Sequence, residues 1–224
     1  KSTMANGGFG SQSIFLEMFG DPATNPKGWV RYKLADLCNV KGGKRLPKGD
    51  EYSDSPTPYR YIRVTDFRNG VIDDQSLHYL KQETFSQISR YIVNSGDLVI
   101  SIAGSIGLIA VVEKKCDGAN LTENAAKLVS RGLIEYNPNF LAVLLRTQPI
   151  QTQIQSHIGQ VTIEKLALFR IEKLDIPLPP LPLQQAFARR VEAIETLKAA
   201  HRASLAKLDA LFASLQHRAF RGEL

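Results

Sequence analysis

The last quarter of the chain constrains the fold most strongly, because it joins a proline run to a long heptad repeat. Residues Ile176–Pro182 read IPLPPLP. Each proline fixes its φ angle and lacks a backbone N–H group. The run therefore predicts an extended, stiff linker that is neither helix nor strand. After this linker, mostly apolar positions recur at alternating spacings of four and three. They are Phe187, Val191, Ile194, Lys198, His201, Leu205, Leu208, Phe212, Leu215 and Ala219.

This repeat predicts one helix of about 35 residues, roughly 52 Å long at 1.5 Å per residue. Lys198 and His201 interrupt the apolar seam near its centre. A helix of that length cannot bury its seam against a small domain alone, so it needs a second helix. We therefore expect a homodimer formed through this helix when the chain is alone.

The region before the prolines has a different pattern, with short apolar runs separated by turn signals. Residues Ser13–Phe19 predict a short helix that ends at Gly20-Asp21-Pro22. Strands are predicted at Arg60–Phe67, Leu98–Ile102 and Leu108–Val112, and helices at Asn139–Arg146 and Pro149–Ile158. This mixture indicates a domain built from both helices and a sheet.

Composition excludes several classes of protein. A hydrophobic fraction of 43% is enough for a real core, and no apolar run approaches the roughly 20 residues of a membrane span. The two cysteines, Cys38 and Cys116, cannot form a disulfide framework and have no zinc-ligand spacing, which favours buried thiols in a cytosolic protein.

Positive charge is concentrated in two segments. Residues 27–68 hold ten basic and five acidic residues, and residues 183–224 hold seven basic and four acidic ones. Such clusters are typical of surfaces that contact nucleic-acid phosphates, although a plain solvated face has the same composition.

Three loops carry the side chains that suit DNA recognition. Lysine and arginine in mobile loops suit phosphates, and we predict this role for Lys41, Lys44, Arg45 and Lys48, with Arg63. Amides and hydroxyls can pair with base edges, and we predict that role for Asn120, Thr122, Asn124, Gln160 and Thr162. Each loop taken singly could also be an ordinary solvated connection.

A catalytic alternative is a metal-dependent nuclease. Asp97 at the start of one apolar run, with Glu113 and Lys115 at the end of the next, forms the skeleton of such a site. The turn signals around these residues favour structural roles instead. We predict no metal site and no catalytic residues.

The order of motifs resembles the DNA-specificity subunit of type I restriction–modification systems. The resemblance covers residues 13–224. It rests on Met18–Trp29 (MFGDPATNPKGW), Tyr61–Asp66 (YIRVTD), Gly96–Val99, Gly104–Gly107, the proline run with Phe187, and the closing stretch Leu211–Leu224.

The resemblance implies an α+β fold in which a target recognition domain with a curved mixed sheet and short helices precedes one long coiled-coil helix. Residues 1–12 would be a tag or a disordered segment, 13–22 the tail of a preceding helix, 23–180 the recognition domain, and 181–224 the spacer and dimerisation helix.

The resemblance also implies what the chain does. A half subunit of this kind would read one half of a split double-stranded DNA target in the prokaryotic cytoplasm. It would bind the methyltransferase subunits and the restriction/translocase subunit. It would hold no cofactor, since S-adenosylmethionine belongs to the methyltransferase subunit. A coiled-coil scaffold with no DNA role is the remaining alternative.

Overall fold

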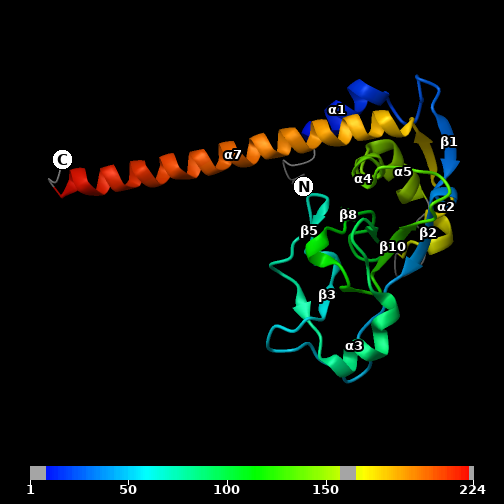
Figure 1. Ribbon diagram of the computed structural model, residues 1–224, viewed down its shortest axis with the longest axis horizontal. Helices are drawn as coiled ribbons and strands as arrows, with labels where there is room; N and C mark the ends of the chain where they lie inside the picture. Colours follow the sequence, from blue (N-terminus) through cyan, green and yellow to red (C-terminus); the bar gives the residue numbers. More distant parts are fainter. Residues whose placement is uncertain (1–8, 157–164, 222–224) are drawn as a thin grey trace.

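A long helix projects from a rounded domain in the computed structural model, which describes residues 9–156 and 165–221 (Figure 1). The helices are α1 (Phe9–Phe19), α2 (Leu34–Leu37), α3 (Gln82–Ile88), α4 (Pro138–Leu145), α5 (Gln148–Ser156), α6 (Leu168–Ile171) and α7 (Leu181–Phe220). Three single 3-10 turns span Val64–Asp66, Ser89–Tyr91 and Lys114–Cys116. Among the described residues, no helix is both long and apolar enough to cross a membrane.

A six-stranded mixed sheet forms the centre of the domain, in the order β2-β10-β7-β8-β5-β4. Its strands are β2 (Cys38–Gly42), β4 (Phe67–Arg68), β5 (Val71–Ile72), β7 (Leu98–Ser101), β8 (Ile109–Val111) and β10 (Ala125–Ser130). Alternate residues of β7 enter two different cores: Leu98 and Ile100 face the helices, whereas Val99 faces the opposite side. Because both faces of β7 are covered, its sequence is a continuous apolar run.

Two smaller sheets complete the domain. The three-stranded sheet has the order β6-β3-β9, with β3 at Arg60–Ile62, β6 at His78–Tyr79 and β9 at Asn120–Leu121. The two-stranded sheet pairs β1 (Val30–Lys33) with β11 (Asp175–Leu178) in antiparallel register. The chain therefore leaves the domain close to where it enters it.

An aromatic cluster fixes both terminal helices to the domain. The ring of Phe187 on α7 lies 5.8 Å from Phe15 and 5.5 Å from Phe19, both on α1, and 5.9 Å from Phe140 on α4. A hydrogen bond also joins α7 to the start of α4: the Oε1 of buried Gln184 accepts the backbone N–H of Asn137 at 2.9 Å. As a result, α1 lies alongside the first turns of α7 (Figure 1).

The predicted seam of α7 divides into a packed part and an exposed part. Phe187 is buried, and Val191 and Ile194 pack against the main core. From Ala199 to Phe220 every side chain is exposed, including Leu208 with 61% of its surface accessible. The helix is 40 residues long, so more than half of it extends beyond any surface that the domain offers.

The prediction of a linker without regular structure over Ile176–Pro182 is wrong. Residues Asp175–Leu178 form β11, where Pro177 lies opposite Arg31. Proline is tolerated there because each strand of a two-stranded sheet is an edge strand. Pro182 lies in the first turn of α7, where a backbone N–H would have no helical partner.

The prediction of one continuous strand over Arg60–Phe67 is also wrong. The chain leaves β3 after Ile62 and makes a 3-10 turn over Val64–Asp66. The carboxylate of Asp66 accepts the backbone N–H of Arg63 at 2.8 Å, which stabilises this turn. The short helix predicted from Ser13 is present but begins at Phe9.

Candidate nucleic-acid interface

The central sheet places the basic loop and the amide-rich loop side by side. Strands β2 and β10 pair antiparallel, with Gly42 opposite Ala126. The basic loop follows β2, and the amide-rich loop precedes β10. Two backbone bonds continue the contact: Gly43 donates to Ala125 at 3.0 Å and Lys44 donates to Leu121 at 2.8 Å. Two loops that the sequence separates by about 80 residues therefore form one surface.

An ion pair joins the side chains of these loops. The Nε of Arg45 donates to Oε1 of Glu123 at 2.7 Å, and the Oγ1 of Thr122 donates to Oε2 at 2.9 Å. The Arg45 side chain is 77% exposed, whereas that of Glu123 is 24% exposed. Because Glu123 neutralises its charge, Arg45 is a weaker candidate for a phosphate contact than its lysine neighbours.

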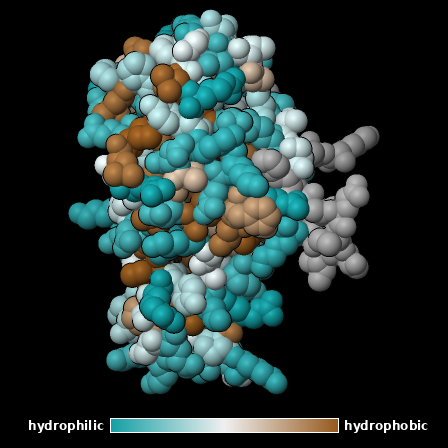
Figure 2. Space-filling model, turned by 90° about the vertical axis from the view of Figure 1, so that its right-hand side faces the viewer, coloured by the Kyte–Doolittle hydropathy of each residue, from teal (hydrophilic) through white to brown (hydrophobic). Residues whose placement is uncertain are grey.

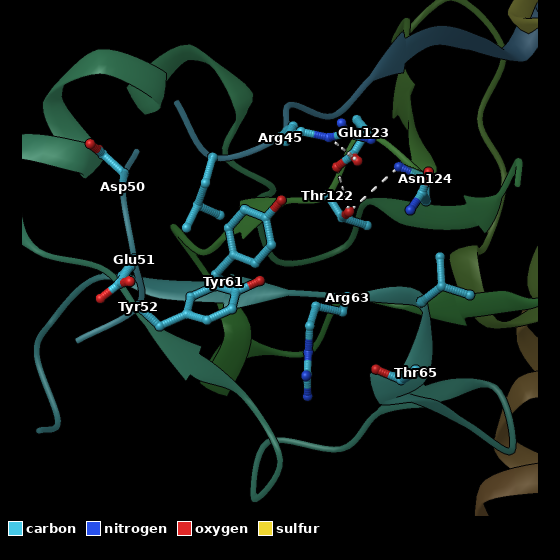
Figure 3. Close-up of a pocket in the computed structure, with 12 residues that line it drawn as sticks. Arg45, Asp50, Glu51, Tyr52, Tyr61, Arg63, Thr65, Thr122, Glu123 and Asn124 are labelled. Atoms are coloured by element: carbon cyan, nitrogen blue, oxygen red, sulfur yellow. Dashed lines mark hydrogen bonds and ion pairs between the residues drawn. The ribbon is translucent and has the colours of Figure 1, made fainter. Parts of the chain in front are cut away.

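A pocket of ≈570 Å³ opens beside this ion pair. Figure 3 shows Tyr52 and Tyr61 across the pocket from Thr122, Glu123 and Asn124. The full lining consists of Arg45, Leu46, Asp50, Glu51, Tyr52, Tyr61, Arg63, Val64, Thr65, Thr122, Glu123 and Asn124. The pocket thus combines aromatic rings with hydrogen-bond donors and acceptors, as sites for nucleobases do.

Arg63 is held in the pocket wall by a fully buried carboxylate. Its Nη2 donates to Oδ1 of Asp66 at 2.9 Å, and its Nε donates to Oδ2 at 3.3 Å. The hydroxyl of Ser76 donates to the same Oδ1 at 3.0 Å. A guanidinium held by two parallel bonds loses little further freedom on binding, which suits recognition of a planar acceptor.

Two tyrosines form the aromatic wall. Tyr61 is buried, its hydroxyl donates to the Lys44 carbonyl at 2.9 Å, and burial raises its pKa to about 12. The ring of Tyr52 stacks on His78, with centroids 4.0 Å apart. Burial of His78 lowers the pKa of its imidazole, so the ring is favoured in its neutral form.

The three predicted phosphate-contacting lysines are all exposed. Lys41 extends from β2, and Lys44 and Lys48 from the loop that follows. The Nζ of Lys44 lies 6.0 Å from the ring centroid of Tyr91, within cation–π range. Nothing in this arrangement prevents these ammonium groups from reaching a phosphate backbone.

The residues predicted to read bases lie in different environments. Asn124 is exposed, and its backbone carbonyl accepts from the N–H of Ile102 at 2.8 Å. Thr122 is 5% exposed and Asn120 is fully buried, with its Nδ2 donating to the Ile88 carbonyl at 2.7 Å. Gln160 and Thr162 lie outside the described residues. Asn120 therefore supports the fold, whereas Asn124 is free to contact a ligand.

Sequence reasoning missed Glu123 and Tyr52 as parts of this surface. Glu123 lies within the amide-rich stretch 120–124 and could have been found there. The base-reading prediction considered only amides and hydroxyls and therefore did not include its carboxylate. Tyr52 carries no local signal, because its contact with His78 forms only in the folded chain. Asp66, by contrast, lies only three residues after Arg63, with which it pairs.

The geometry gives no support to the nuclease alternative. Asp97 is buried, and its carboxylate accepts the backbone N–H of Asn94 at 2.9 Å. Lys115 forms ion pairs with Glu113 at 3.2 Å and with Asp74 at 3.0 Å. Within the described part of the chain, no three His, Cys, Asp or Glu side chains are placed to hold a metal ion.

Comparison with known protein families identifies the family to which this chain belongs. Residues 26–210 match the type I restriction modification DNA specificity domain. The chain belongs to this family. The specificity subunit of the type I restriction enzyme EcoBI from Escherichia coli is 30% identical over 210 residues, which are 89% of this chain and 42% of that subunit. The MjaVIII specificity subunit of Methanocaldococcus jannaschii is 22% identical over 77% of this chain and 40% of that subunit.

The fold agrees with this relationship. The HsdS subunit from Thermoanaerobacter tengcongensis superposes with a TM-score of 0.62 at 20% identity, covering 98% of this chain and 52% of that one. The predicted α+β specificity domain followed by a long helix is confirmed. The chain spans about half the length of these relatives, or less.

The molecular surface is mainly polar on the side away from the free end of α7. Figure 2 shows this side with hydrophilic residues over most of it and apolar residues only in small, separate patches. The outer part of α7, from Ala199 to Phe220, differs from this side, because it exposes large apolar side chains that include Leu205, Leu208 and Phe212.

Proposed function

We propose that this chain is the DNA-binding specificity component of a type I restriction–modification system and reads one half of a split target. The observation that carries the proposal is the single surface on which the basic loop, the amide-rich loop and the pocket meet. Family membership supplies the class of ligand, and the surface supplies side chains suited to double-stranded DNA.

Two parts of this surface have separate tasks in the proposal. Lys41, Lys44 and Lys48 contact phosphates and hold the domain on any duplex. Asn124 and the pocket residues meet base edges in the major groove, where the pattern of donors and acceptors distinguishes all four base pairs. Lysine contacts therefore contribute affinity, and pocket contacts contribute sequence preference.

The long helix has an assembly role in the proposal. Its exposed seam from His201 to Leu215 buries against a second long helix, and in the isolated chain this gives a homodimer. In the complete system, the chain docks methyltransferase subunits and the restriction subunit. It performs no catalysis itself and binds no cofactor, since S-adenosylmethionine is held by the methyltransferase subunit. The cytoplasm is the compartment that contains this DNA.

A methylation profile tests this function directly. Cells carrying the chain with its methyltransferase partner should show adenine methylation at one defined motif, and cells lacking the chain should not. The purified chain should also bind duplex DNA with an affinity that falls steeply as salt rises. A chain that dimerises but shows no salt-dependent DNA affinity would instead be a coiled-coil scaffold.

A further inference from the structure

The carboxylate of Glu123 is oriented by two hydrogen bonds from its own protein. Oε1 accepts from Arg45 and Oε2 accepts from Thr122, at 2.7 and 2.9 Å. The Oγ1 of Thr122 in turn accepts the backbone N–H of Asn124 at 3.5 Å. Figure 3 shows this chain of contacts at the edge of the pocket. A flexible side chain is thereby fixed in a position that faces the proposed DNA surface.

Glu123 can act only as a hydrogen-bond acceptor. Burial raises the pKa of its carboxyl, but the hydrogen bonds from Arg45, its own backbone and Thr122 outweigh this effect and hold the pKa below its ordinary value. The two oxygens of a carboxylate offer about four lone-pair positions in all, and the protein supplies three donors to them: Arg45, Thr122 and the backbone of Glu123 itself. The remaining position can accept a hydrogen bond from a ligand that lies in the pocket or at its edge.

We propose that Glu123 is a specificity-determining residue that accepts a hydrogen bond from the N4 amino group of a cytosine in the major groove. This inference rests on the proposed function and adds the chemical group that one part of the surface selects. Arg45 and Thr122 act as positioning residues, because they contact Glu123 and orient its carboxylate.

Electrostatics favours cytosine over the other ligands that DNA offers. A phosphate carries the same sign of charge as Glu123 and is repelled. Guanine and thymine present acceptors to the major groove, and a carboxylate cannot pair with them. Adenine presents its N6 amino group beside the N7 acceptor, whereas cytosine presents only the amino donor. An acceptor-only side chain therefore has its best partner in cytosine.

A binding selection with the full-length chain tests the inference. The probe is a duplex library with randomised positions, from which bound DNA is recovered and sequenced. The wild-type chain should enrich cytosine at one position, with a preference of at least about 5-fold. Glu123→Gln should lose that preference and gain adenine at the same position, because a glutamine amide pairs bidentately with adenine. Thr122→Val should weaken the cytosine preference without creating a new one.

Glu135→Gln is the matched control, since Glu135 is an exposed carboxylate that lies outside the pocket. It removes the same charge and should leave the base preferences unchanged. If Glu123→Gln keeps every wild-type preference while its thermal unfolding matches wild type, the inference is overturned and the ion pair only joins the loops. Loss of preference at a base other than cytosine overturns it as well. If the wild-type chain enriches no sequence and shows no salt-dependent affinity, the proposed function itself fails.

Discussion

Gly43 lies directly against the peptide of Thr122. A Cβ atom on Gly43 would stand 2.1 Å from the carbonyl oxygen of Thr122 and 2.4 Å from that of Leu121. No side chain fits there, because both neighbours are backbone atoms held by hydrogen bonds. The close approach lets the basic loop and the amide-rich loop share one surface.

Gly43→Ala should therefore separate the two loops. We expect the free energy of unfolding to fall by about 1–3 kcal/mol, as for other overpacked sites, and DNA affinity to fall with it. Urea denaturation measures the change. Gly42→Ala is the control, because its Cβ would meet only the Cδ1 of Leu168 at 3.7 Å. Equal stability of the two variants would mean that the loops adjust freely.

Tyr61→Phe should remove one hydrogen bond from this surface and change the response to alkali. The lost bond to the Lys44 carbonyl should cost about 1 kcal/mol. Because the folded-state pKa of Tyr61 is raised from 10.0 to about 12, the folded chain retains this proton in a pH range where the unfolded chain loses it. Wild-type stability should decline between these values, since the unfolded state binds fewer protons there. Tyr61→Phe should decline less steeply over the same range in pH-dependent urea denaturation, and parallel curves would contradict the prediction.

The helix and the central strands could be predicted from the sequence because their signals are local. Heptad spacing indicated α7, and continuous apolar runs indicated β7 and β8. The residue types of the candidate surface could also be read from the sequence. Their partners could not, because Arg45 and Glu123 are 78 residues apart and meet only through the pairing of β2 with β10. The proline run was misinterpreted for a related reason: Pro177 is tolerated because β11 pairs with β1 alone and is therefore an edge strand, which only the folded chain shows.

Lysines of the basic loop should control the salt dependence of DNA binding. Lys44→Gln with Lys48→Gln should lower the slope of log affinity against log salt by roughly 1.8, which is about 0.9 per contact. The loss should be similar for all sequences, since phosphates carry no sequence information. Fluorescence anisotropy at several salt concentrations provides the measurement. Lys81→Gln with Lys114→Gln makes the same charge change at exposed sites outside both basic segments and should leave the slope unchanged. Identical slopes in both variants would assign the loop lysines to an ordinary solvated face.

Two neighbouring asparagines, Asn120 on β9 and Asn124 in the loop after it, should give opposite phenotypes. Asn124→Ala should reduce discrimination at one base position by about 1–3 kcal/mol, because its exposed amide can pair with adenine. Asn120→Ala should instead reduce stability by about 1–3 kcal/mol, because it leaves the buried carbonyl of Ile88 without the amide donor. Methylation profiling and urea denaturation of both variants separate the two effects. If Asn124→Ala keeps the parental motif at every position, base reading lies elsewhere on the surface.

Self-association should depend on the exposed half of the α7 seam. Leu205 and Leu208 are 59% and 61% accessible, and they belong to a seam whose earlier members, Phe187 and Val191, already pack on the domain. Burying two carboxylates in a helix–helix interface without partners costs several kcal/mol, so Leu205→Asp with Leu208→Asp should weaken dimerisation at least about 100-fold. Ala203→Asp with Ala210→Asp adds the same charge on the opposite face of the helix and should leave the dimer intact. Light scattering over a range of concentrations distinguishes the species. A wild-type chain that stays monomeric at high concentration would show that the seam is not sufficient for self-association and needs a different helix as its partner.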